Sequence, residues 1–142
     1  MPTIAADLSG GCLCGTVRYR LGQAPRDAGW CHCRTCQLNS GSPAMAFATA
    51  EIAAMTIERG AQILRRHASS AEAERWFCGS CGTPLWVQDR EGATTRDFNL
   101  ATLDVPSAVS PGFHIYWDSR IAWDHPADQL PRYPRSRREG LG

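Results

Sequence analysis

The sequence predicts a mainly β fold, and three observations lead to this prediction. Residues 16–21 alternate between polar and apolar side chains, and residues 98–102 show the same period-2 pattern, which is typical of half-buried strands. No long stretch of the chain shows helical periodicity. Two glycine-bearing turns, 10–15 and 78–82, each carry a cysteine pair beside an expected strand. We therefore expect antiparallel sheets organised around metal-binding turns.

Further stretches with strand character follow in chain order. After 16–21 they are 44–49, 55–58, 63–67, 75–77, 85–87, 98–104 and 113–117. The alanines of the first stretch leave a short helix as an alternative there, and residues 51–54 are expected to form one helical turn. We expect 55–58 and 63–67 to pair with each other around Gly60, with loops at 22–29, 89–96 and 105–112. Residues 69–74 are polar and expected to be exposed.

The length and composition indicate one ordinary globular domain. The chain has 142 residues, of which 43% are hydrophobic and 20% charged. We expect a single zinc-binding domain over residues 1–131 and a surface tail over 132–142, where prolines and arginines gather. A net charge of +1 gives no electrostatic case for nucleic acid or for an anionic membrane.

The chain carries no apolar run of the roughly 18 residues that a spanning helix needs, and its first residues show no signal pattern. The expected location is therefore the cytoplasm, where a reducing environment disfavours structural disulfides. The seven cysteines are also an odd number, which argues against a closed disulfide framework. Metal binding is the better use of these thiols.

The two cysteine pairs are expected to form one closed structural zinc site from Cys12, Cys14, Cys78 and Cys81. Glycine lets each turn bend so that both sulfurs face one point, and two such turns offer four thiolates in tetrahedral geometry. We expect backbone N–H groups of the turns to hydrogen-bond to the sulfurs. The alternatives are four reduced cysteines that pack as small hydrophobes, and an iron–sulfur cluster, which takes the same ligand set.

The remaining cysteines, Cys31, Cys33 and Cys36, lie in the segment Cys-His-Cys-Arg-Thr-Cys. Three protein ligands with an exchangeable fourth position are typical of catalytic zinc. His32 is an alternative fourth ligand, although a side chain between two cysteines that share one metal tends to point away. A thiolate-rich zinc favours a soft substrate thiol and would hold it as a nucleophile near pH 7. A second structural zinc and a metal-free thiol cluster stay open as alternatives.

Other cysteine motifs are excluded. Covalent haem attachment needs a histidine after Cys36, where Gln37 stands. Zinc nucleobase deaminases need His-x-Glu and Pro-Cys-x-x-Cys, and classical zinc fingers need a histidine pair at a fixed spacing; the sequence has none of these.

At its cysteines the chain resembles the glutathione-dependent formaldehyde-activating enzyme (Gfa) family, which also includes centromere protein V-like proteins. The matching stretches are 10–19, 31–36 with 40–41, and 77–85, and weaker matches lie at 99–104, 114–117 and 123–131. The resemblance covers nearly the whole chain.

The resemblance implies a β-tent fold of antiparallel sheets and two zinc ions per chain. The structural zinc would be held by Cys12, Cys14, Cys78 and Cys81, and the catalytic zinc by Cys31, Cys33 and Cys36. The implied activity is that of a carbon–sulfur lyase that condenses glutathione with formaldehyde, or another small aldehyde, to give S-hydroxymethylglutathione in the formaldehyde case. No motif for glutathione-contacting residues matches, and the sequence gives no indication of oligomeric state.

Two functions follow from this sequence. The first is an enzyme in which a thiol substrate, expected to be glutathione, docks at the three-cysteine zinc and attacks a small aldehyde. The second is a non-catalytic, zinc-stabilised binding module. An open fourth position beside a pocket favours the enzyme, whereas a closed fourth ligand such as His32 or a buried cluster favours the module.

Overall fold

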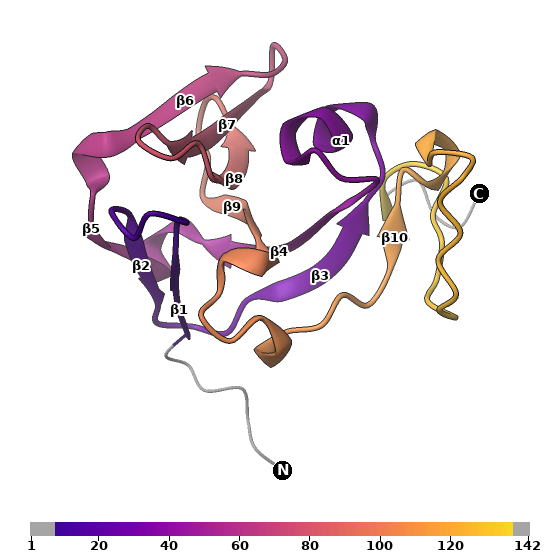
Figure 1. Ribbon diagram of the computed structural model, residues 1–142, viewed down its shortest axis with the longest axis horizontal. Coiled ribbons are helices and arrows are strands. Elements are labelled where there is room, and N and C mark those ends of the chain that lie inside the picture. Colours follow the sequence, from indigo (N-terminus) through magenta and orange to yellow (C-terminus); the bar gives the residue numbers. More distant parts are fainter. Residues whose placement is uncertain (1–7, 138–142) are drawn as a thin grey trace.

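The computed structural model describes residues 8–137, whose strands form two sheets (Figure 1). The smaller sheet has the order β1-β2-β5 and consists of β1 (Leu8–Gly11), β2 (Arg18–Leu21) and β5 (Met55–Arg59). The larger sheet has the order β10-β3-β4-β9-β8-β7-β6. Its strands are β3 (Arg26–Cys31), β4 (Met45–Glu51), β6 (Leu64–Ala68), β7 (Ala73–Cys78), β8 (Pro84–Asp89), β9 (Thr95–Asn99) and β10 (His114–Ile115).

Neighbouring strands are antiparallel in both sheets, except that β10 runs parallel to β3. The predicted mainly β class is therefore confirmed. No helix among residues 8–137 is long and apolar enough to cross a membrane.

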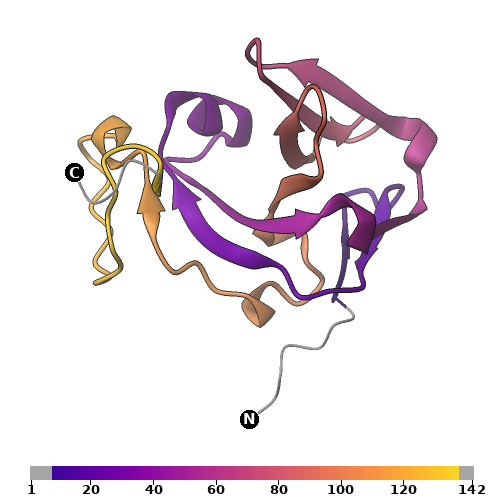
Figure 2. The same ribbon diagram turned by 180° about the vertical axis from the view of Figure 1, so that it is seen from behind.

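The helical elements in the described part of the chain are short. They are α1 (Arg34–Ser40) and the 3₁₀ turns η1 (Ile52–Ala54), η2 (Ala61–Ile63), η3 (Leu100–Thr102), η4 (Pro106–Ala108) and η5 (Trp117–Ser119). Helix α1 ends at Gly41, whose φ of 69° lies in the left-handed region that glycine adopts readily. Both views place α1 between the β7–β8 hairpin and the end of the large sheet that carries β10 (Figures 1 and 2). The sequence reading missed α1, because so short a helix shows no periodicity.

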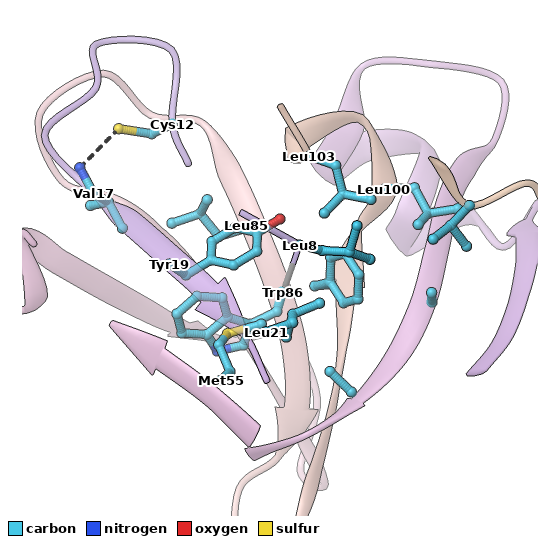
Figure 3. Close-up of a cluster of buried hydrophobic side chains, with 14 of the residues drawn as sticks. Leu8, Cys12, Val17, Tyr19, Leu21, Met55, Leu85, Trp86, Leu100 and Leu103 are labelled. Carbon is cyan, nitrogen blue, oxygen red and sulfur yellow. Dashed lines mark hydrogen bonds between the residues drawn. The ribbon is translucent and has the colours of Figure 1, made fainter. Parts of the chain in front are cut away.

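The main core lies between the two sheets. The apolar residues of the alternating stretch, Val17, Tyr19 and Leu21, each have 0% exposure, which confirms the half-buried strand expected there. Figure 3 shows Tyr19 and Leu21 close to Leu85 and Trp86, which β8 contributes from the larger sheet. Burying a large apolar side chain stabilises the fold by about 1.5–3 kcal/mol, so these contacts hold the sheets together.

The two faces of the large sheet have different roles, and adjacent cross-strand rows show this. One row faces the core and consists of Ala48, Phe98, Trp86, Trp76 and Arg66. The next row faces the opposite side and consists of Thr49, Asp97, Val87, Arg75 and His67. Because successive side chains of a strand alternate between faces, a shift of one residue separates packing residues from candidate site residues.

The strand expected at 44–49 is confirmed as β4, and the helical turn expected at 51–54 is confirmed as η1. The expected pairing of 55–58 with 63–67 is wrong, because β5 pairs with β2 and β6 pairs with β7. The cause lies at Gly60, which has a φ of 81° and packs so closely that a Cβ would clash with the Thr16 carbonyl oxygen. The following turn, η2, then leads the chain into the other sheet.

Several expected boundaries are also corrected. The strand expected at 98–104 ends at Asn99, because the Asn99 side chain accepts a hydrogen bond of 3.2 Å from the Ala101 N–H and starts η3. The strand expected at 113–117 is limited to His114–Ile115, since Tyr116 has a φ of 54° and η5 follows. Strands β3 and β9 begin inside the loops expected at 22–29 and 89–96, and β7 begins inside the segment expected at 69–74 to be exposed, where Glu74 is buried.

The C-terminal segment runs along β10. The His114 N–H donates to the Pro131 carbonyl at 2.8 Å, and the Tyr133 N–H donates to the His114 carbonyl at 2.9 Å. Residues 138–142 of the expected tail, and residues 1–7, lie outside the described residues.

Candidate metal centres and the adjoining pocket

The turn before β2 and the turn between β7 and β8 bring four thiols together. Cys12 and Cys14 lie in the first turn, and Cys78 and Cys81 lie at the end of β7 and in the second turn. The Leu13 N–H donates to the Thr83 hydroxyl oxygen at 3.0 Å and so ties the turns to each other. All four sulfurs lie within 4.8 Å of one another.

These sulfur positions fit a tetrahedral metal. The Cys12 and Cys14 Sγ atoms lie 3.6 Å apart, and the Cys14 and Cys78 Sγ atoms lie 3.9 Å apart. Four sulfurs at about 2.3 Å from a central Zn²⁺ would be about 3.8 Å from each other. The donor set is therefore suited to a closed, four-thiolate zinc site.

Backbone N–H groups point at these sulfurs, as expected. The Val17 N–H donates to the Cys12 Sγ at 3.2 Å, a contact drawn in Figure 3. The N–H groups of Ser80 and Cys81 both donate to the Cys78 Sγ at 3.4 Å. A hydrogen bond with the Thr83 hydroxyl lowers the pKa of Cys81 to about 5. Such donors stabilise the thiolate form, which is the form that binds a metal.

The second thiol cluster lies where β3 meets α1. Cys31 is the last residue of β3, Cys33 is the N-cap of α1, and Cys36 lies in its first turn. The Cys36 N–H donates to the Cys33 Sγ at 3.3 Å, so a cysteine takes the capping position usually held by Ser or Asp. The three sulfurs lie within 4.8 Å of one another. The N-cap position of Cys33 and the first helical turn up to Cys36 thus bring the three thiols together within one short segment.

Within this cluster one thiol, Cys33, favours its ionised form, whereas the pKa of its two neighbours is raised. Hydrogen bonds from the Cys31 and Cys36 thiols lower the pKa of Cys33 to about 2, whereas the pKa of Cys31 is raised, first by its hydrogen bond with Cys33. A cluster that stabilises a thiolate in this way fits a cationic metal. Zinc is the ion to which such a soft, thiolate-rich donor set is suited.

His32 points away from the cluster. Its Nε2 lies 2.8 Å from the His114 Nδ1, and the His114 Nε2 lies 3.0 Å from an oxygen of Asp128. The side chain of His32 has 1% exposure and belongs to neither thiol group among residues 8–137. The alternative of His32 as a fourth ligand therefore has no geometric support.

A pocket opens beside the three thiols. Its volume is about 380 Å³, and Cys31, Cys33 and Cys36 line it together with polar and apolar residues from the sheet. The remaining lining residues are Thr35, Met45, Phe47, Arg75, Val87, Asp97, Ile115 and Tyr116. The three thiols thus lie on one side of a space that has room for a small molecule.

Arg75 lies at the junction of this pocket with a second one of about 490 Å³. Its Nη1 and Nη2 lie 3.7 and 3.6 Å from the Cys36 Sγ. Its Nε donates to the Ser69 hydroxyl at 3.3 Å, and its Nη1 donates to the Asn39 Oδ1 at 3.4 Å. No carboxylate lies within ion-pair distance of Arg75 among residues 8–137. The guanidinium is therefore held in place with its charge available to an anionic ligand.

Sequence reasoning missed Arg75 and Asp97. Arg75 lies in the strand expected at 75–77, whereas Asp97 falls between the loop expected at 89–96 and the strand expected at 98–104. Each faces the pocket only through the register of β7, β8 and β9, so the sequence held no clear signal for either.

Comparison with known proteins agrees with the cysteine pattern. The family described as glutathione-dependent formaldehyde-activating enzyme matches residues 7–119. A protein of Schizosaccharomyces pombe named an uncharacterized lyase is 32% identical over 86 residues, which are 61% of each chain. A putative glutathione-dependent formaldehyde-activating enzyme of Halomonas elongata is 32% identical over 92 residues, 58% of this chain and 56% of that protein. The chain thus spans about three fifths of the length of these curated relatives.

A solved structure shares the fold. The crystal structure of a Rhodobacter sphaeroides protein superposes with a TM-score of 0.57 at 29% sequence identity. The superposition covers 72% of this chain and 91% of that protein.

Proposed function

Because the chain belongs to the glutathione-dependent formaldehyde-activating enzyme family, we propose that it adds the thiol of glutathione to formaldehyde. The product is S-hydroxymethylglutathione, formed in the carbon–sulfur bond-making direction of a lyase. The observation that carries this proposal is the cluster of three thiols, which is open on one side to a 380 Å³ pocket. The alternative fourth ligand that would close the site, His32, faces elsewhere, which favours the enzyme over a closed structural site.

The proposed metal ligands divide into two sets. Cys12, Cys14, Cys78 and Cys81 would hold a structural zinc, and Cys31, Cys33 and Cys36 would hold a second one. When bound at the second site, Zn²⁺ would supply Lewis acidity that lowers the pKa of a substrate thiol.

The pocket walls suit the addition of a thiol to an aldehyde. Phe47, Val87 and Ile115 give it apolar walls, which limit competition by water. In the reaction the thiol loses its proton, its sulfur bonds to the carbonyl carbon, and the carbonyl oxygen gains a proton. The protein's tasks are thus to orient the thiol, to hold the aldehyde beside it and to move one proton.

Arg75 supports glutathione as the thiol. Glutathione carries two carboxylates, and the Arg75 guanidinium lies between the thiol pocket and the second pocket. We propose that the glutathione sulfur lies near the three cysteines while one carboxylate contacts Arg75 from the second pocket. His67 and Asn39 line that pocket and offer further polar contacts.

A titration tests the proposed function. Glutathione and S-methylglutathione, which has no thiol proton to lose, are titrated into zinc-loaded protein in a calorimeter. We expect saturable binding of glutathione, and binding weakened at least about tenfold for the methylated analogue. Equal binding of both compounds, or binding of neither, would refute thiol activation and favour the binding module.

Two arginine-to-glutamine variants test the proposed contact between Arg75 and a glutathione carboxylate. Arg75→Gln should weaken glutathione binding by about 10–100-fold, since a charge-assisted hydrogen bond contributes about 1.5–3 kcal/mol. The thiol cysteamine, which lacks a carboxylate, should bind both proteins with similar affinity. Arg66→Gln is the matched control, because Arg66 lies on the opposite face of the same sheet. Equal losses for both thiols in Arg75→Gln would contradict the contact.

A further inference from the structure

The pocket contains a carboxylate that the proposed metal ligands do not use. Resting on the proposed function, we propose that Asp97 carries the proton between the substrate thiol and the aldehyde oxygen. Asp97 lies on β9 and lines the same 380 Å³ pocket as the three thiols. Among the described residues, no other carboxylate side chain lines this pocket.

The sheet register places Asp97 across the pocket floor from Arg75. Asp97 pairs with Val87 on β8, and Val87 pairs with Arg75 on β7, so the three side chains share one face. Adjacent strands lie about 4.8 Å apart, which puts the backbones of Asp97 and Arg75 about 10 Å from each other. Arg75 contacts the Cys36 sulfur, and Asp97 and the three cysteines line the same pocket of about 380 Å³, which has room for a small aldehyde.

The local contacts hold Asp97 without neutralising it. The Thr49 hydroxyl donates to the Asp97 Oδ1 at 2.7 Å and fixes the carboxyl group from the neighbouring strand. Among residues 8–137 no arginine, lysine or histidine lies within ion-pair distance of Asp97. The second oxygen is therefore available to a ligand.

The surroundings of Asp97 favour its protonated form more than water does. Burial raises the pKa of Asp97 above its ordinary 3.8, the Thr49 hydrogen bond opposes this, and the charges of Asp27 and Asp89 raise the pKa further. The charged and titratable groups that face Asp97 from the packed elements are Arg26, Asp27, Glu51, Arg75, Asp89, Tyr116 and the three pocket cysteines. A general acid–base group works best when neither of its forms is strongly disfavoured at the operating pH.

The proposed reaction conserves protons and electrons and regenerates Asp97. The Asp97 carboxylate accepts the proton of the bound thiol. The thiolate sulfur then bonds to the carbonyl carbon, and the carbonyl π electrons move to oxygen. The Asp97 carboxylic acid returns the proton to that oxygen, which gives the hemithioacetal and regenerates the carboxylate. No oxidant, reductant or further reactant is needed.

Asp97→Asn tests this role, because asparagine keeps the shape and the acceptor for Thr49 but cannot exchange a proton. We expect kcat for S-hydroxymethylglutathione formation, measured by exchange NMR, to fall at least about 100-fold, which is the contribution typical of general acid–base catalysis. The dissociation constant of glutathione should change less than about threefold. Glu58→Gln is the matched control, because it removes a partly exposed carboxylate from β5 in the other sheet, away from the pocket lining, and it should leave both quantities unchanged.

The pH profile and chemical rescue separate proton transfer from a structural role. Wild-type kcat should fall as pH is lowered through the pKa of Asp97, and Asp97→Asn should lose this dependence. Acetate should restore part of the rate of Asp97→Ala and should leave the rate of Glu58→Ala unchanged. The role is refuted if Asp97→Asn keeps kcat within about threefold, if its glutathione affinity falls with its rate, or if Tyr116→Phe abolishes the pH dependence instead. Absence of glutathione binding to the wild type would refute the proposed function itself.

Discussion

Replacing Cys78 by serine should damage folding far more than replacing Cys33. Each change removes one proposed zinc ligand and exchanges sulfur for oxygen, so the two variants are chemically matched. They differ in what the thiol connects. Cys78 is fully buried and joins the β7–β8 turn to the turn before β2, whereas Cys33 is half-buried and belongs to a cluster formed by one short segment. Structural metal binding contributes directly to the free energy of folding.

The expected difference follows from loop closure and burial. Cys14 and Cys78 are 64 residues apart, and a cross-link over such a loop lowers the entropy of the unfolded chain by an amount worth about 4 kcal/mol. The Cys31–Cys36 cluster closes a loop of about five residues, for which the same relation gives about 2 kcal/mol. A buried serine hydroxyl at position 78 adds a desolvation cost of about 1–3 kcal/mol. The two variants should therefore differ by about 3–5 kcal/mol, or roughly 10–20 °C in melting temperature.

Calorimetric melting of the zinc-loaded proteins measures this difference. We expect Cys33→Ser to melt cooperatively within several degrees of the wild type and Cys78→Ser to melt much lower or to be insoluble. Addition of a chelator should destabilise the wild type and Cys33→Ser by similar amounts, because both keep the four-thiolate site. Equal destabilisation of the two variants would refute the assignment of a structural site and a functional one.

The other predictions concern metal content and the pocket carboxylate. Elemental analysis should find about two zinc ions per chain after reconstitution; one zinc, or iron with visible absorption, would contradict the division into four and three thiols. Asp97→Asn should raise the melting temperature at pH 7, because burial holds the folded-state pKa of Asp97 above 3.8 and the ionised carboxylate therefore costs stability above that pH. This gain should disappear as pH falls below 3.8, and a lower melting temperature of Asp97→Asn at pH 7 would contradict the reasoning.

The fold class and the two thiol groups could be predicted because their signals are local. Alternation along 16–21 predicts a half-buried strand, and its apolar residues are fully buried, Tyr19 and Leu21 in β2 and Val17 just before it. Cysteine spacing similarly predicts which sulfurs meet inside each turn and in the segment that starts α1, whereas the two cysteine pairs, 64 residues apart, are brought together by the fold. The pairing of strands was harder to predict. The left-handed conformation at Gly60 directs β5 and β6 into different sheets, although they are neighbours in sequence.

The pocket could not be predicted, because long-range register creates it. Arg75, Val87 and Asp97 come from three strands and share a face only because each pair lies opposite in the sheet. A one-residue slip of β9 would exchange Asp97 for Phe98, which belongs to the core face. The sequence therefore indicates the proposed metal ligands, whereas the residues that would bind and orient a substrate become apparent only from the fold.

His32 shows how geometry decides an alternative that spacing leaves open. The backbone is extended from Cys31 to Cys33, so successive side chains alternate in direction, and the two cysteines face the pocket while His32 faces the opposite side. There the 2.8 Å contact with His114 links the thiol segment to β10, and Asp128 contacts His114 from the C-terminal segment at 3.0 Å. The buried histidine pair thus supports the thiol segment from behind. It explains why a histidine within the cysteine motif serves the site without contributing a ligand.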